Sequence, residues 1–139
     1  MRSLFSTYPF LIPLVVLVLS EATKILTDSV REGGFAIHRA FHPGGMPSTH
    51  SGFVTSLLIV VARVAGVESL AFTIAFVFAC VIWYDAMSLR REVGEQAKVL
   101  NLLQKRVKFW DRAGHSFKEV LSGIAFGAVV TWGGIVLVS

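Results

Sequence analysis

Charged residues are scarce in this chain of 139 residues: they make up 16% of it, against ~25% in an ordinary soluble domain. Hydrophobic residues account for 54% of the sequence, and the mean hydropathy is +0.68. These values exclude an ordinary soluble domain. The length allows one domain, residues 1–139, which in a bilayer would hold about four spans of ~20 residues.

Cysteine is nearly absent too. The single Cys80 lies inside an apolar run, so the sequence has neither a disulfide framework nor a thiolate metal cluster. The net charge of +4 does not indicate nucleic acid, because the basic residues stand between long apolar runs, where they would face lipid headgroups or an anionic substrate. A cleaved signal peptide is the rival interpretation of the apolar N-terminus, but no small-x-small cleavage site precedes a plausible mature start.

Four apolar segments predict an all-α membrane fold, an integral helical bundle with about four transmembrane helices. They run over Leu4–Ala22, Ser51–Val67, Leu70–Met87 and Val120–Val138. Only a few residues separate the second segment from the third, which predicts a tight helical hairpin. In the last long connection, Val93–Val107 has apolar residues at helical spacing and predicts an amphipathic helix that could lie along the headgroups.

The polar connections fall on one side of this bundle. They follow the first and third spans, over Thr23–His50 and Ser88–Glu119, and they carry eleven of the thirteen Lys and Arg residues. The positive-inside rule therefore places this polar face in the cytoplasm.

Cleaving a phosphoester without a metal needs cations for the phosphoryl oxygens, a nucleophile, and an acid for the leaving group. Lys24 and Arg31 stand two helical turns apart and can project to one side. Taken alone, either cation could equally well extend to the membrane interface without any role in a site. In GGMPSTHS, glycine and proline shape a turn that delivers Ser48 and His50 to the start of a helix, where free backbone N–H groups attract anions.

A second histidine completes the set. Glu119 follows His115 by four residues, so a carboxylate can face the imidazole and fix its tautomer. Arg90 and Arg91 cannot be separated as anion ligands, and either could instead pair with a nearby carboxylate.

Two further patterns have simpler explanations. The spacing of His38 and His42 could suit zinc, but no third ligand is evident, so no metal is expected. The GxxxG spacing of Gly123 and Gly127 indicates close helix packing.

These residues resemble the divergent branch of the phosphatidic acid phosphatase type 2 superfamily, which is related to vanadium-dependent haloperoxidases. The first motif of that superfamily, Lys then six residues then Arg-Pro, resembles KILTDSVRE, with Glu32 where proline is usual. The second, Pro-Ser-Gly-His, resembles PSTH, with Thr49 in place of glycine. The third, Ser-Arg then five residues, His, three residues and Asp, is split between SLRREVGEQ and HSFKEVLSG, as if an insertion separated its halves. The string YDAMSLRREVGEQAKVLN itself resembles the hallmark of the divergent branch.

The resemblance implies a phosphatase that needs neither metal nor cofactor and acts on a lipid phosphate or pyrophosphate. His115 would attack phosphorus and His50 would protonate the leaving oxygen, while Glu119 orients His115. The phosphoryl oxygens would be held by Lys24, Arg31 and Arg90, helped by Ser48. The altered motifs leave a second hypothesis open, a non-catalytic anionic-lipid-binding or scaffold protein, and a small channel or carrier subunit ranks third. A homo-oligomer is compatible with either of the first two.

Overall fold

The computed structural model describes residues 7–33, 45–109, 111 and 114–138, without the side chains of Arg31, Glu32 and Val138. Within these ranges the chain forms helices and no strand, which confirms the predicted all-α fold. The helices are α2 (Leu11–Glu32), α3 (Thr49–Ala65), α4 (Leu70–Met87), α5 (Leu89–Leu103) and α6 (Phe117–Val138).

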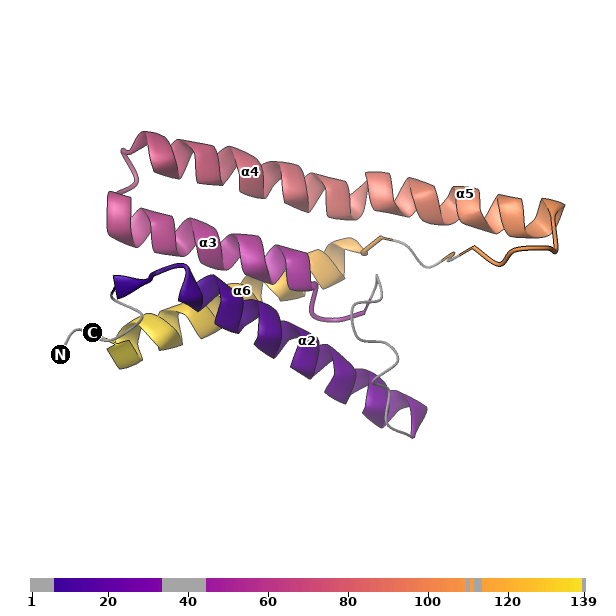
Figure 1. Ribbon diagram of the computed structural model, residues 1–139, viewed down its shortest axis with the longest axis horizontal. Coiled ribbons are helices and arrows are strands. Elements are labelled where there is room, and N and C mark those ends of the chain that lie inside the picture. The colour runs from indigo at the N-terminus through magenta and orange to yellow at the C-terminus, as the bar shows by residue number, and fades with distance from the viewer. Residues whose placement is uncertain (1–6, 34–44, 110, 112–113, 139) are drawn as a thin grey trace.

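Helix α3 is the centre of the bundle, because it packs against α2, α4 and α6 (Figure 1). Contacts between successive turns of α3 and α6 show that these two helices run in the same direction, whereas α2 and α4 run the opposite way. The end of α2, the starts of α3 and α6, and the junction of α4 with α5 therefore gather at one end of the bundle. This is the end where the sequence places its polar connections.

The apolar segments appear where the sequence predicts them, with shifted ends. Helix α4 has the predicted bounds, and α4 with α5, as well as α6, are long and apolar enough to cross a membrane. Helix α3 is apolar but has only 17 residues. Helix α2 continues for ten residues beyond the predicted end of its span at Ala22, so the start of the predicted polar connection is helical.

The predicted amphipathic helix is α5, which begins four residues before Val93 and ends at Leu103 rather than Val107. Ser88 separates it from α4, but α5 keeps nearly the direction of α4 and extends past the rest of the bundle (Figure 1). That this helix lies along the headgroups stays a prediction. The chain then returns to the bundle at the start of α6.

Three glycines let α3 and α6 touch along their backbones. A Cβ on Gly127 would meet the carbonyl oxygen of Gly52 and lie 2.8 Å from its Cα, and a Cβ on Gly123 would meet the carbonyl oxygen of Ser48. One turn beyond, Thr131 Oγ1 donates to Ser56 Oγ at 2.7 Å across the same interface. We call this line of contact the glycine seam, and it confirms the close packing predicted from the GxxxG spacing.

Replacing Gly127 with alanine is expected to destabilise the bundle, because the new methyl group forces two backbones apart. Overpacking of this kind costs about 1–3 kcal/mol, which lowers the Tm in detergent by about 3–10 °C. Gly133→Ala is the matched control on the same helix, since a Cβ there meets nothing within 4 Å. That variant should melt at or slightly above the wild-type temperature, because alanine favours helix. Equal melting of the two variants would contradict the seam.

Candidate functional site

Lys24 and the start of α3 are joined through a glutamate. Lys24 is only 5% exposed, and its Nζ lies 4.0 Å from Glu21 Oε2. The other oxygen of Glu21 accepts a hydrogen bond of 2.7 Å from Thr49 Oγ1. Thr49 stands where the second motif usually has glycine, and its hydroxyl connects the start of α3 to α2 one turn before Lys24.

The turn before α3 covers the hydrocarbon part of Lys24. Gly45 has φ +89°, and a Cβ on it would lie 3.4 Å from Lys24 Cε. One residue on, the carbonyl oxygen of Met46 lies 3.3 Å from Thr27 Oγ1, whose hydroxyl has a nearer acceptor in the carbonyl oxygen of Thr23 at 2.6 Å. The turn thus lies against α2 directly before α3 begins.

Ser48 and His50 leave this turn in different directions. Ser48 is fully buried in the glycine seam, its Oγ lies 2.9 Å from Ser51 Oγ, and its backbone N–H donates to the carbonyl oxygen of Glu119 at 3.3 Å. His50, in the first turn of α3, is exposed. The first-turn N–H groups of a helix lack intrahelical acceptors, so they can bind an anion next to the imidazole.

His115 is buried immediately before α6. Its backbone N–H donates to the carbonyl oxygen of Ala86 at 3.0 Å, which ties it to the end of α4. Its Nδ1 lies 3.8 Å from Glu119 Oε2 and has no hydrogen-bond partner in the described part of the chain. Glu119 Oε2 accepts instead from the N–H of Ser116 at 2.6 Å and from Ser116 Oγ at 3.0 Å. This is a capping box, so Glu119 caps α6 while it lies beside the imidazole.

The charge state of His115 follows from its surroundings. Burial lowers the pKa of His115 below its ordinary value of 6.5, because the charged imidazolium loses water. Glu119 raises this pKa, whereas the charges of His50, Lys24 and Arg90 lower it further. The net effect is downward, so His115 is neutral at neutral pH. The same contributions show that the two histidines and the two cations share one electrostatic neighbourhood.

The split halves of the third motif meet at Gly114. This glycine has φ +96°, and a Cβ on it would lie 2.6 Å from the backbone nitrogen of Arg91 and 2.8 Å from the carbonyl carbon of Arg90. The residue after Gly114 is His115, so this contact sets the histidine beside the start of α5. Arg90 Nε donates to Asp85 Oδ2 at 2.9 Å. Of the two adjacent arginines, Arg90 is the one whose charge acts on His115.

The order and content of these three elements match one known family. The model of the divergent PAP2 family matches residues 5–130. The chain belongs to this family. It is also 28% identical to the "Uncharacterized membrane protein YuiD" of Bacillus subtilis (strain 168) over 148 residues, which cover 92% of this chain and 94% of that protein. No solved structure matches. The predicted resemblance is confirmed, and together with the two apolar helices these comparisons support a membrane location.

Not every predicted site residue of this divergent PAP2 protein can be placed. Arg31 lies in the last turn of α2, seven residues after Lys24 on a continuous helix, but its side chain lies outside the described residues. His38 and His42, the alternative zinc pair, lie outside them as well. No group of three residues that could hold a metal ion occurs in the described ranges.

Three residues of the site were missed by the sequence analysis. Glu21 precedes Lys24 by three residues, a helical spacing that could have indicated it. Ser116 begins an S-x-x-E pattern, which is a sequence signature of a helix start. Gly114 directly precedes the histidine, but a lone glycine does not reveal which backbone it touches.

Proposed function

We propose that this divergent PAP2 protein is a metal-independent phosphatase that hydrolyses a phosphomonoester or pyrophosphate, most simply of a lipid, through a phosphohistidine. One observation carries the proposal. His50, in the first turn of α3, and His115, immediately before α6, share an electrostatic neighbourhood with Lys24 and Arg90 at one end of the bundle. A protein that only binds an anion needs the cations, but it has no use for both imidazoles.

In the first chemical step, neutral His115 attacks phosphorus. Nδ1 faces Glu119, so Nε2 is the nitrogen left to form the P–N bond as the bond to the leaving oxygen breaks. His50 becomes the imidazolium when the phosphoryl dianion binds, because a nearby negative charge favours the charged form, and it gives its proton to that oxygen. In the second step neutral His50 removes a proton from water, the water oxygen attacks phosphorus, and the P–N bond breaks. Phosphate leaves and both histidines return to their starting states.

The cations hold the phosphoryl oxygens once they exchange partners. Lys24 lies beside Glu21 and Arg90 is paired with Asp85, so an entering phosphoryl group competes with two carboxylates. Arg31 adds a third cation in the proposal. The pair of Arg90 with Asp85 is partly exposed, and charge-assisted contacts to a dianion are stronger than such a pair, which favours the exchange at Arg90.

Glu119 and Ser48 act by positioning. The carboxylate of Glu119, now 3.8 Å from His115 Nδ1, is close enough to become a hydrogen-bond acceptor when substrate closes the site, since catalytic hydrogen bonds are often long without substrate. Ser48, buried in the glycine seam, holds the turn that presents His50.

The substrate class follows from where the site lies. It is formed where the helices of the bundle end, which in a four-span protein is the level of the lipid headgroups. A lipid phosphate can place its headgroup there without leaving the bilayer. We propose that residues 1–139 form one such multi-pass domain, with the site on the cytoplasmic face as the distribution of Lys and Arg favours.

The test is phosphate release by the purified protein in detergent, with EDTA present, from a panel of lipid phosphates and pyrophosphates. We expect turnover with the chelator, and inhibition by vanadate, which resembles the five-coordinate phosphorus of the transition state. Turnover that stops with EDTA and returns with a divalent metal would overturn the mechanism. If no substrate is hydrolysed, but vanadate still raises the Tm of wild type and not of Lys24→Gln, the protein is the anionic-lipid-binding module instead.

A further inference from the structure

At the end of the bundle away from the histidines, α3 and α6 separate. The glycine seam holds them together as far as Ser56 and Thr131, and beyond this pair α3 carries Ile59 and α6 carries Trp132. Large side chains cannot pack at the backbone distance that glycines allow, so the two helices diverge toward their C-terminal ends (Figure 1).

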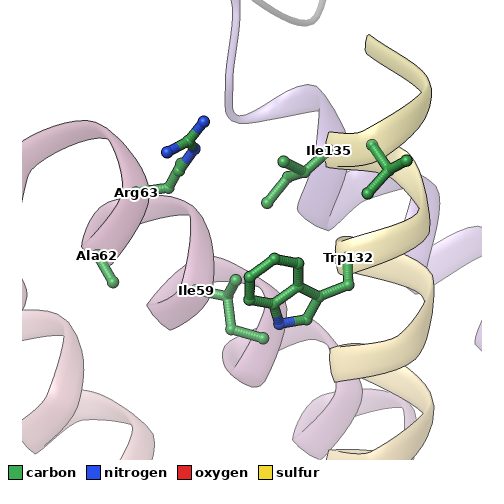
Figure 2. Close-up of a pocket in the computed structure, with 6 residues that line it drawn as sticks. Ile59, Ala62, Arg63, Trp132 and Ile135 are labelled. Atoms are coloured by element: carbon green, nitrogen blue, oxygen red, sulfur yellow. The ribbon is translucent and has the colours of Figure 1, made fainter. Parts of the chain in front are cut away.

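A groove of about 590 Å³ fills the space that this divergence opens. Such a volume lies within the range of ~300–1,000 Å³ that is typical of small-molecule sites. Figure 2 shows Ile59 of α3 and Trp132 and Ile135 of α6 pointing into the space between the helices, with Arg63 at its edge. Trp132 is 62% exposed, so the groove is open on the side where a spanning bundle meets lipid.

Arg63 gives this otherwise apolar groove a positive charge. It is exposed in the last turn of α3, and no described carboxylate lies within 4.0 Å of it. Arg63 follows His50 by 13 residues, which is about 20 Å along the helix. It is therefore too far from the histidine site to act there. An arginine at the end of a membrane helix can extend to the interface, where the phosphates of anionic lipids are available as partners.

We propose that the groove binds an anionic phospholipid from the leaflet opposite the histidine site. One acyl chain lies between α3 and α6 against Ile59, Trp132 and Ile135, and the headgroup phosphate pairs with the Arg63 guanidinium. An arginine can donate hydrogen bonds to two phosphate oxygens at once, which suits Arg63 to binding the headgroup. The apolar walls of the groove contact the acyl chain, and the guanidinium of Arg63 pairs with the headgroup phosphate. Both halves of the lipid are therefore recognised.

The experiment compares binding of phosphatidylglycerol and phosphatidylcholine to the full chain by native mass spectrometry. Saturating vanadate is added so that the histidine site does not contribute. Wild type should retain phosphatidylglycerol more strongly than phosphatidylcholine. In Arg63→Gln the ratio of retained phosphatidylglycerol to retained phosphatidylcholine should fall about fivefold. This is the equivalent of about 1 kcal/mol for one basic residue near an anionic lipid. The preference should survive in Arg106→Gln, which removes an exposed cation from the connection between α5 and α6.

A second variant tests the apolar part and does not depend on Arg63. Ala62 lines the groove, and Ala62→Trp should fill it and reduce retention of both lipids while leaving the cation in place. Two results would overturn the proposal: equal retention of the two lipids by wild type, or a preference lost in Arg106→Gln and kept in Arg63→Gln. The second result would assign lipid selection to the basic connection.

Discussion

His115→Ala is expected to lower phosphate release by a factor of about 10⁴ or more, the scale of loss when a catalytic nucleophile is removed. The reason is that no other described residue offers a buried, neutral imidazole beside the cations of the site. Vanadate should still bind to the variant, because Lys24 and Arg90 remain. The measurement is turnover of the lipid substrate found in the screen, together with acid-labile, base-stable phosphate on the protein after rapid quenching. That signal should appear in wild type and be absent from His115→Ala.

His50→Ala is the comparison that separates the two histidines. As a general acid, His50 contributes about 10²–10⁴-fold, and only where the leaving oxygen needs a proton. The variant should therefore lose most of its activity on an alkyl phosphate, but far less on an aryl phosphate with a good leaving group. His115→Ala should lose both activities alike. If His50→Ala were equally impaired on both substrates, His50 would have a binding role rather than an acid role.

Gly114→Ala is expected to reduce activity by about 10²-fold, because displacing catalytic groups by about 1 Å costs that much. The added Cβ would lie 2.6 Å from the Arg91 nitrogen and 2.8 Å from the Arg90 carbonyl carbon, so the turn that carries His115 must move away from α5. Strain at positive φ adds about 1 kcal/mol of destabilisation. Turnover and thermal melting of the same preparation measure the two effects.

The matched control for this variant is Gly66→Ala, in the connection between α3 and α4. Gly66 also has a positive φ, +85°, but a Cβ there meets nothing within 4 Å. Because its ψ of 153° places it in a region that is nearly restricted to glycine, Gly66→Ala should show strain of about 1–3 kcal/mol without the loss of turnover. If Gly114→Ala kept nearly full activity, the contact between the split halves of the third motif would have no part in placing His115.

The helices could be predicted from the sequence because their signals are local. A run of apolar residues specifies a span wherever it lies in the chain, and α4 appears with the bounds that its composition predicts. The GxxxG spacing likewise predicted the close face of α6. The end of α2 was harder, because Lys24 and Asp28 look like a solvated connection when read as composition. They lie on a helix because α3 and its preceding turn pack against that side of α2.

The arrangement of the site was harder to predict from the sequence, because it depends on contacts between segments that are far apart in the chain. The hydrogen bond from Thr49 to Glu21 joins residues 28 apart, and no local pattern predicts it. The resemblance implied that Ser48 helps to hold the phosphoryl oxygens, and that remains a prediction; the burial of its side chain in the glycine seam depends on the contact between α3 and α6, which no local pattern predicts. Which of the two arginines pairs with Asp85 depends on the direction of the α4–α5 junction, and the structure shows that it is Arg90.

The backbone leaves the bundle after Arg91 and comes back at Gly114, and these two points touch. A connection whose two ends touch can become longer or shorter with little change in the free energy of folding, since doubling the length of a flexible loop adds only about 0.6 kcal/mol of closure entropy. The interval between Arg90 and His115 can therefore change in length while the contact between Arg91 and Gly114 is kept. A pattern search with a fixed interval would pass over such chains, whereas a search for an arginine at one helix junction and a glycine-histidine pair before a later helix would find them.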